Sequence, residues 1–376
     1  HIQNGFINWG ENCPKISEEE FDKITKNNSI EKNNVLLTIV GTLGRSCIVD
    51  TSTPFTVQRS VAILKFNEGI NSIFMKYFFD SIQFQNDLKK HARGVAQVGV
   101  YLNSLKKFMI SLPPLNEQKR IVSKIEELFS RIDSAKQSLE HTKLQLEQYR
   151  ASLLKSAFEG KLTEEWRNKN KLKFSTGNEV LRKIKETTNF KQRKLTELDI
   201  SDKLYQLPLE WLWANIFDIS TVQTGPFGTQ LHRSDYTVSG TPIIEIGDVH
   251  PDRNLSDGSA HFISNKKSKE LTRFSVCKND ILFTRVGTVG RCTIVPKSCN
   301  GWLMSTSLIR VRANPIFNSK FLFLYFISPI AQYFAEKTSK GSTRKGTNSK
   351  IVGSIPMIIL SNEEQKEIVS QIEQGF

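Results

Sequence analysis

Long apolar stretches are missing from this sequence, which limits the classes of protein it can belong to. A membrane helix needs about 18 consecutive apolar residues, whereas the richest apolar run covers residues 321–327 and is stopped by Pro329. The five cysteines form no Cys-x-x-Cys pair, so neither a zinc site nor a disulfide framework is indicated. No signal-peptide pattern is present. These absences favour a cytoplasmic protein with reduced thiols.

Motifs that carry chemistry are missing too. There is no Gly-x-x-x-x-Gly-Lys-Ser/Thr phosphate loop, no His-Glu-x-x-His motif and no Asn-Pro-Pro-aromatic tetrapeptide. Six scattered histidines make no metal cluster. Pro251 and Asp252 faintly suggest a nuclease core, but no suitably spaced Glu-x-Lys follows. We therefore expect a protein that is not itself an enzyme and that holds no metal or cofactor.

What the sequence does have is an excess of positive charge. It contains 52 Lys and Arg against 38 Asp and Glu, a net charge of +14. This excess favours an anionic partner, with nucleic acid ahead of a membrane surface. Residues 207–361 hold 18 basic against 10 acidic side chains, and residues 161–206 hold 12 against 7. Residues 116–160 are nearly balanced, with 8 against 7, as a protein-contacting element would be.

An internal repeat organises the chain. Residues 38–50 match residues 284–296 at eight of 13 positions, at an offset of 246. The segment 117–126 matches 364–373 at an offset of 247, and scattered Phe, Lys and Gly residues between these segments keep that offset. The chain is therefore predicted to be a tandem duplication.

Each repeat is expected to be a mixed α/β globule followed by a long helix. The strand-like runs 34–40 and 280–286 end at a Gly-Thr-x-Gly turn. A helix is predicted next, around 73–88 in one repeat and 320–334 in the other. Glycine-rich polar loops follow at 93–99 and 339–346.

The strongest local pattern lies after Pro113 and Pro114. Asn116 is a good helix N-cap, and apolar residues then recur in steps of four and three, a period of 3.5 residues that is typical of a coiled coil. The predicted partner is the matching helix that starts at Asn362. The predicted seam consists of Ile121, Ile125, Leu128, Ile132, Leu139, Leu146, Tyr149 and Leu153.

Three segments resemble the specificity subunit family of type I restriction-modification systems. Residues 112–122 (LPPLNEQKRIV) are similar to the family's junction between a target recognition domain and its conserved helix. Residues 157–167 (AFEGKLTEEWR) are similar to the end of that helix, and residues 207–213 (LPLEWLW) to the opening of a recognition domain. The resemblance covers essentially the whole chain and depends on order and spacing.

The resemblance implies an α+β protein in which each recognition domain binds one half of a bipartite DNA site. It also implies that the two conserved helices set the gap between the half-sites. Partners would be double-stranded DNA, methyltransferase subunits that bind S-adenosylmethionine, and motor-nuclease subunits that use ATP and Mg²⁺. Self-association through the helix seam is a further expectation. The assembled complex, rather than this chain, would cleave DNA and methylate adenine.

The repeat and the resemblance together predict the domain boundaries. Because the second globule opens about 40 residues before the position equivalent to His1, we expect both ends to be truncated. The predicted segments are a first recognition domain lacking its N-terminal part (1–115), a spacer helix (116–160), a basic linker (161–206), a second recognition domain (207–361) and the start of a second conserved helix (362–376).

Candidate DNA-binding residues lie in polar loops of both globules, where phosphate contacts supply affinity and base contacts supply specificity. The repeated arginine after the Gly-Thr-x-Gly turn is either a phosphate contact or a structural turn residue. The other loop residues either contact DNA or are solvated. The candidates are Arg45, Arg93, Gln230, Arg233, Lys266, Lys267, Arg285, Arg291, Lys340, Arg344 and Lys345.

Two other classes of protein stay open. One is a coiled-coil scaffold that binds only protein, although a scaffold has no need for duplicated globules with basic loops. The other is a fragment of a stand-alone restriction or methylation enzyme. Unaided cleavage or methylation of DNA would favour the fragment, whereas failure to bind DNA even with partner subunits would favour the scaffold.

Overall fold

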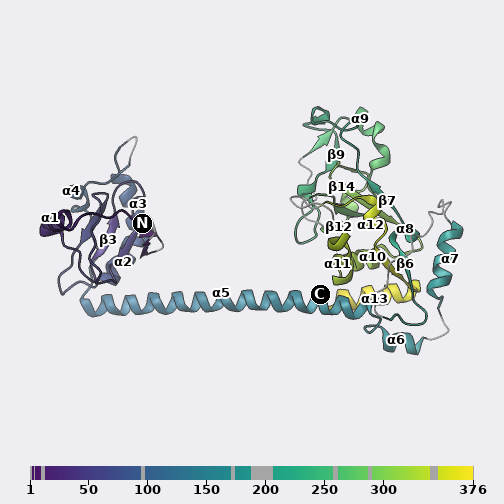
Figure 1. The fold of residues 1–376 in the computed structure, drawn as a ribbon, viewed down its shortest axis with the longest axis horizontal. Coiled ribbons are helices and arrows are strands. Elements are labelled where there is room, and N and C mark those ends of the chain that lie inside the picture. Colours follow the sequence, from purple (N-terminus) through teal and green to yellow (C-terminus); the bar gives the residue numbers. More distant parts are fainter. Residues whose placement is uncertain are drawn as a thin grey trace. The chain divides into compact units, whose positions relative to one another are not determined.

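A computed structural model of the chain describes residues 2–3, 5–9, 13–94, 98–170, 174–187, 206–256, 261–286, 290–338 and 346–375. The chain divides into two compact units, unit 1 (His1–His141) and unit 2 (Thr142–Phe376). Both units mix helices with antiparallel strands, and one long helix begins in unit 1 and ends in unit 2 (Figure 1). The predicted fold class, two similar mixed globules joined by a long helix, is confirmed.

Unit 1 is built around a small antiparallel sheet with the strand order β4-β3-β5. Helices α2 and α3 pack against it and close a core that includes Val35, Leu37, Phe79 and Phe84. A short hairpin, β1-β2, lies beside the edge strand β4. The elements are β1 (Ile2–Gln3), β2 (Phe6–Ile7), α1 (Glu18–Asn28), β3 (Val35–Thr38), β4 (Ser46–Ile48), β5 (Val61–Leu64), α2 (Ser72–Asp80), α3 (Ile82–His91) and α4 (Leu102–Leu105).

Unit 2 contains the same arrangement with additions at its start and on its outer side. The elements before the shared sheet are α6 (Glu164–Lys169), α7 (Gly177–Thr187), β6 (Leu212–Asn215), α8 (Ile216–Ile219), β7 (Ser220–Thr224), β8 (Tyr236–Thr237), β9 (Thr241–Ile244), β10 (Phe262–Ile263) and α9 (Asn265–Glu270). The later elements are β11 (Ile281–Thr284), β12 (Cys292–Ile294), β13 (Leu303–Met304), β14 (Leu308–Ala313), α10 (Ser319–Phe326), α11 (Pro329–Thr338), α12 (Ser349–Gly353), β15 (Pro356–Ile359) and α13 (Asn362–Gly375).

The described residues of unit 2 form three sheets. The central sheet, β12-β11-β14-β7, corresponds to the unit 1 sheet with one strand added. An outer sheet, β13-β9-β10-β8, has its own core around Ile243, Ile263 and Met304. The third sheet pairs β15 with β6, and all four residues of β15 are buried. The outer sheet is thus an addition to the fold that the two units share, and its own hydrophobic cluster stabilises it.

The duplication extends to individual hydrogen bonds. Gln85 in α3 donates to the carbonyls of Gly44 and Phe79, both at 2.7 Å. Gln332 in α11 makes the equivalent bonds to Gly290 and Phe326, at 2.9 and 2.6 Å. Both side chains are partly buried, and an amide donor shielded from water costs free energy if it has no partner. The same side chain therefore ties the Gly-Thr-x-Gly turn to the helix pair in both units.

In each unit, the single helix that was predicted to follow the sheet is instead two consecutive helices. Residues 73–88 divide into α2 and α3, and residues 320–334 divide into α10 and α11. The break falls at Ser81, whose hydroxyl caps α3 by accepting from the amide of Phe84 at 3.3 Å. The equivalent residue is Ser328, and Pro329 begins α11. A helix N-cap serine favours a new start, and proline is tolerated only in a first turn, so one continuous helix is disfavoured.

The spacer helix α5 (Leu115–Phe158) has 44 residues and is about 66 Å long at 1.5 Å per residue. It begins one residue before the predicted N-cap Asn116, because the amides of Glu117 and Gln118 already bond to the carbonyl of Pro114. In the described part of the chain, neither α5 nor any other helix has the length and apolarity needed to span a membrane.

Candidate nucleic-acid interface

Arg45 and Arg291 occupy the same place in their units. In each case Nη1 of the guanidinium donates to a backbone carbonyl 3.3 Å away, that of Ile2 in unit 1 and that of Val249 in unit 2. Ile2 and Val249 are themselves 247 residues apart, so the repeat includes this contact. The side chain therefore supports the turn. A guanidinium has five N–H donors, which leaves others for a phosphate, and the phosphate contact stays a prediction.

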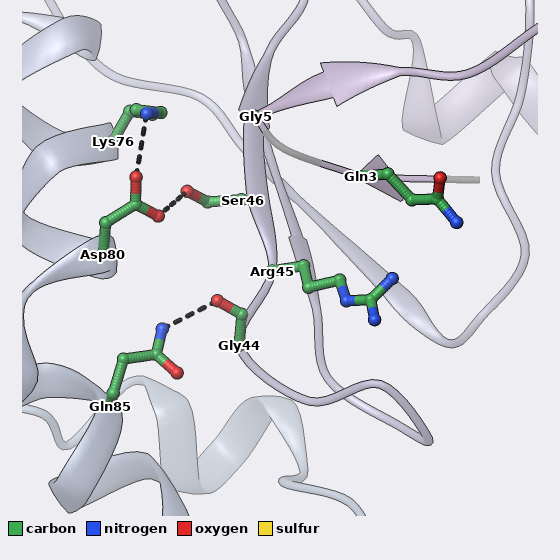
Figure 2. A pocket seen from close by; sticks show the side chains of 8 residues that line it. All are labelled: Gln3, Gly5, Gly44, Arg45, Ser46, Lys76, Asp80 and Gln85. Atoms are coloured by element: carbon green, nitrogen blue, oxygen red, sulfur yellow. Dashed lines mark hydrogen bonds and ion pairs between the residues drawn. The ribbon is translucent and has the colours of Figure 1, made fainter. Parts of the chain in front are cut away.

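The Arg45 turn borders a cavity of about 560 Å³ in unit 1. Figure 2 shows Lys76, Asp80 and Ser46 linked on one side of the strand and the Arg45 guanidinium on the other. The Lys76 ammonium lies 2.8 Å from the Asp80 carboxylate, which also accepts from the Ser46 hydroxyl at 2.7 Å. The lining residues are Gln3, Gly5, Gly44, Arg45, Ser46, Lys76, Asp80 and Gln85.

The polar side chains Lys76, Asp80 and Ser46 of this cavity are not repeated in the sequence of unit 2. At the repeat offset, Lys76 and Asp80 correspond to Phe323 and Ile327, and Ser46 corresponds to Cys292. Cys292 is buried, and burial raises the pKa of its thiol to about 12, so it is a neutral side chain. The two units thus share a frame but differ in the chemistry beside the repeated arginine.

The glycine-rich loops are anchored in the same way in both units. Gly99 forms a β-bridge with Val40, and Gly346 forms the equivalent bridge with Val286. Arg93 is exposed, and its backbone pairs with Gly99 in both directions at 2.9 and 3.0 Å. Three predicted DNA-binding residues lie outside the described residues: Lys340, Arg344 and Lys345.

In unit 2, cationic side chains gather where the outer sheet meets α9. Ser264 caps this helix by accepting from the amide of Lys267. Lys267 is paired, with Asp235 at 3.9 Å and Glu270 at 3.2 Å, so it joins α9 to the segment that carries Arg233. Arg233 and Lys266 are exposed. The structure therefore gives Lys267 a structural contact and leaves Arg233 and Lys266 at the surface.

Two other predicted residues are partly engaged in local structure. The side-chain oxygen of Gln230 accepts from the amide of Phe227 at 3.3 Å, within a turn. The guanidinium of Arg285 donates to the carbonyl of Thr306 at 3.2 Å, next to the central sheet. Both side chains are only partly buried. Their contact with DNA stays a prediction.

The predicted coiled-coil seam is covered at its two ends and exposed between them. Ile121 joins the core of unit 1, and Leu153 packs against the core of unit 2. In unit 2, α13 lies alongside this end of α5 (Figure 1), with Gly375 next to Leu153 and Tyr149. Ile125 is partly buried. The exposed seam residues are Leu128, Ile132, Leu139, Leu146 and Tyr149.

Sequence reasoning missed a pair of buried glutamines. It assigned the Glu-Gln-Lys segments to the helix dipole through their glutamates. The structure instead buries the glutamines completely, Gln118 in unit 1 and Gln365 in unit 2. Their side-chain oxygens accept from the amides of Asn71 and Asn318, at 2.8 and 2.9 Å. The identical Gln at the repeat offset was the available signal for this shared role.

The glutamates of the same segments differ between the units. Glu364 is buried and accepts from Thr163 and Arg167 at 2.8 Å and from the Trp211 indole at 2.9 Å. Burial raises the pKa of the Glu364 carboxyl, and these three donors oppose that rise. Glu117 is partly exposed and pairs with Arg120 on the next turn of its own helix.

A metal-dependent reaction has no evident centre in the described residues. Within those ranges, no group of three or more His, Cys, Asp or Glu side chains is placed to hold a metal ion. What the structure offers is a repeated frame with a structural arginine, an anchored loop and surface cations, which are features of a binding protein.

Comparison with known proteins agrees with the duplicated architecture. The chain belongs to the family of the type I restriction modification DNA specificity domain, whose sequence model matches residues 2–144 and again residues 208–374. The predicted family is thereby confirmed. This chain is 29% identical to the type I restriction enzyme EcoBI specificity subunit of Escherichia coli over 276 residues, which are 73% of this chain and 52% of that subunit.

A second relative gives the same result. The chain is 29% identical to the EcoKI specificity subunit of Escherichia coli (strain K12) over 325 residues, which are 84% of this chain and 60% of that protein. The matched part of the chain therefore spans between half and two thirds of the length of these two relatives.

Solved structures show the same fold. The HsdS subunit from Thermoanaerobacter tengcongensis is 17% identical with a TM-score of 0.52, covering 92% of this chain and 73% of that one. A chain from a structure that concerns complex assembly and conformational transition of the type I R-M system is 18% identical with a TM-score of 0.59. That match covers 92% of this chain and 74% of the other.

Proposed function

We propose that this chain is the DNA-recognition subunit of a type I restriction-modification complex, with each unit reading one half of a bipartite site. The observation that carries the proposal is the repeated frame with different side chains on it. Both units hold the turn arginine and the glycine-anchored loop in the same way. A shared frame suits contact with the DNA backbone, which is alike at both half-sites.

Different half-sites need different base contacts, and the units differ where those contacts would be made. In the counterpart of the loop at Arg93, Lys340 stands in the place of Arg93 and two further cations follow, Arg344 and Lys345. Unit 2 also adds an outer sheet with exposed Arg233 and Lys266. Arginine and lysine bind phosphates and guanine edges, so these residues suit both affinity and specificity.

In this proposal the helix α5 is the spacer that fixes the gap between the half-sites. Its 44 residues are continuous, and its ends pack into the cores of unit 1 and unit 2 separately. A helix held in a core at each end transmits a defined length, whereas a flexible linker does not. The exposed seam between the ends suits a helix partner, which agrees with the proposed coiled coil.

The catalytic work belongs, in this proposal, to partner subunits. Methyltransferase subunits would supply S-adenosylmethionine chemistry, and motor-nuclease subunits would supply ATP and Mg²⁺ chemistry. The family relatives are described as specificity subunits of type I restriction enzymes. Because the proposed target is cellular or invading DNA, we place the complex in the cytoplasm.

Selection from random-sequence double-stranded DNA, with the chain bound to its methyltransferase partner, tests this function. We expect two short conserved half-sites of different sequence separated by a fixed number of unselected base pairs. One contiguous site would contradict bipartite recognition. Failure to bind any DNA at low salt would favour a protein-binding scaffold, and cleavage or methylation by the chain alone would favour a stand-alone enzyme.

A further inference from the structure

Several loops of unit 2 meet at one end of its central sheet, where β7 and β11 finish and β14 begins. The amide of Gly225, directly after β7, donates to the carbonyl of Leu308 in β14 at 2.9 Å. On the other side of β14, the amide of Arg285 donates to Ser307 at 2.8 Å, and its carbonyl accepts from Thr347 at 2.9 Å. The turn after β7, the turn before β14 and the end of the glycine-rich loop therefore lie together.

This end of the sheet carries positive charge. The guanidinium of Arg285 donates to the carbonyl of Thr306 at 3.2 Å, which uses one of its five N–H donors. Arg291 is at the same end, because its carbonyl accepts from the amide of Thr284, the last residue of β11, at 3.0 Å. The glycine-rich loop is anchored here through Gly346. Cations from separate segments at one place suit a polyanion such as DNA.

The turn after β7 presents an aromatic ring to solvent at this place. Phe227 is 64% exposed, whereas Gly225 and Pro226 before it are buried. Gly225 lies so close to the carbonyl of Ser305 that there is no room for a side chain. The base of the turn is thus packed tightly against the protein, and its tip is the phenyl ring.

Gln230 holds the backbone of Phe227 in place. The amide of Gln230 donates to the carbonyl of Phe227 at 2.7 Å, and the side-chain oxygen of Gln230 accepts from the amide of Phe227 at 3.3 Å. One residue therefore satisfies both backbone polar groups of Phe227. A side chain on a backbone that is already ordered loses less conformational freedom when it binds a partner.

A phenyl ring has little choice of contacts on double-stranded DNA. It forms no strong hydrogen bonds, and the apolar group that base edges offer in the major groove is the methyl group of thymine. The faces of the bases are apolar too, but a side chain reaches them only by unstacking a base step, which costs free energy. The methyl contact needs no such deformation and is therefore favoured.

We propose that Phe227 contacts the methyl group of a thymine in the half-site read by unit 2, and that Gln230 positions Phe227 for this contact. The contact, which rests on the proposed function of reading DNA, makes Phe227 a specificity-determining residue. Arg285 and Arg291 lie at the same end of the sheet, where they suit the phosphates or guanine edges next to that thymine.

Deoxyuridine tests the contact because it is thymidine without the methyl group. The chain, bound to its methyltransferase partner, is titrated with the selected bipartite site, and fluorescence anisotropy reports the affinity. Each thymine is replaced in turn by deoxyuridine. We expect one position at which the affinity falls about fourfold, the value of one buried methyl group. Phe227→Ala should bind the thymine site about tenfold more weakly and should not distinguish thymine from deoxyuridine at that position.

Further variants separate positioning from contact. Gln230→Ala should reduce the discrimination between thymine and deoxyuridine, whereas Gln230→Glu keeps the accepting oxygen and should keep the discrimination even if its charge lowers the overall affinity. The ring of Phe227 is mostly exposed, so its removal should leave the fold intact. Leu209→Ala is the control, because Leu209 is 100% exposed and its neighbour Pro208 lies against Gly160, just after α5. This variant should keep both affinity and discrimination.

Four results would overturn the proposal. They are a bipartite site at which no deoxyuridine lowers the affinity, discrimination that persists at every position in Phe227→Ala, and equal effects of Phe227→Ala and Leu209→Ala. The fourth is weaker assembly of Phe227→Ala with the methyltransferase subunit in the absence of DNA, which would make a protein the partner of the ring. In all four cases bipartite binding itself would still support the proposed function, whereas failure to bind any DNA would refute both.

Discussion

Replacing Glu364 by alanine should destabilise unit 2, whereas the same change at Glu117 should not destabilise unit 1. Glu364 is 3% exposed and accepts hydrogen bonds from Thr163, Arg167 and Trp211. Its removal leaves Arg167 without its carboxylate partner, in a side chain that is only 11% exposed. Breaking one side of a buried ion pair costs about 3–5 kcal/mol, and the slight exposure of Arg167 favours the lower end, about 3 kcal/mol.

Urea unfolding followed by tryptophan fluorescence measures this difference. Four of the five tryptophans lie in unit 2, so the signal reports mainly on that unit. With a denaturant slope of about 3 kcal/mol per molar, a loss of about 3 kcal/mol lowers the urea midpoint by about 1 M. The exposed pair of Glu117 and Arg120 should contribute less than about 1 kcal/mol.

The comparison can refute the reasoning in two ways. A loss below about 1 kcal/mol for Glu364→Ala would show that the buried network contributes no more than an exposed ion pair. Equal losses for the two variants, each measured with a probe in its own unit, would show that burial does not distinguish them. A double variant with Arg167→Ala isolates the pairwise contribution, which we expect to be favourable.

Three more outcomes are expected. Arg233→Ala and Lys266→Ala should each reduce the salt dependence of DNA binding by about one phosphate contact. Lys136→Ala, in the exposed part of α5, is the control and should leave the salt dependence unchanged. If all three variants keep the original salt dependence, Arg233 and Lys266 do not contact DNA phosphates. Inserting one heptad in that part of α5 lengthens the helix by about 10 Å, which should widen the gap in the recognised site by about three base pairs; an unchanged gap would exclude the helix as spacer. The exposed Cys277 should react quickly with a thiol reagent, while burial raises the pKa of Cys47 to about 11 and should keep it unreactive until the chain unfolds, so fast labelling of Cys47 would contradict its burial.

The fold was predictable because the repeat is visible at a steady offset of 246 or 247 residues. Positions that hold the frame together, such as the turn arginine, the loop glycines and the glutamine at 118 and 365, are identical in both copies. The heptad pattern after Pro114 predicted the long helix, because an apolar period of 3.5 residues sustained over many turns keeps one face of a helix apolar along its whole length.

Two features were predicted less well. The apolar runs after the sheet were assigned to single helices, because the break depends on one capping serine, Ser81 or Ser328, rather than on the apolar pattern. The difference between Glu117 and Glu364 was not foreseen either. Both glutamates occupy the same sequence position, and only the tertiary structure brings Trp211 to one of them.

The candidate site was predictable in kind but not residue by residue. Sequence identified polar loops and a repeated arginine, but Lys267 and Gln230 proved to have local partners that spacing does not reveal. Hydrogen bonds of this kind depend on the exact path of a loop, which the pattern of residue types does not specify.

Sequencing the methylated adenines in cells that carry the complete system tests the central claim most directly. If two diverged units on one helix read DNA, the methylated sites share a motif in two different parts, separated by a constant number of unspecified base pairs. A single continuous motif, or two parts at a variable distance, would contradict the account.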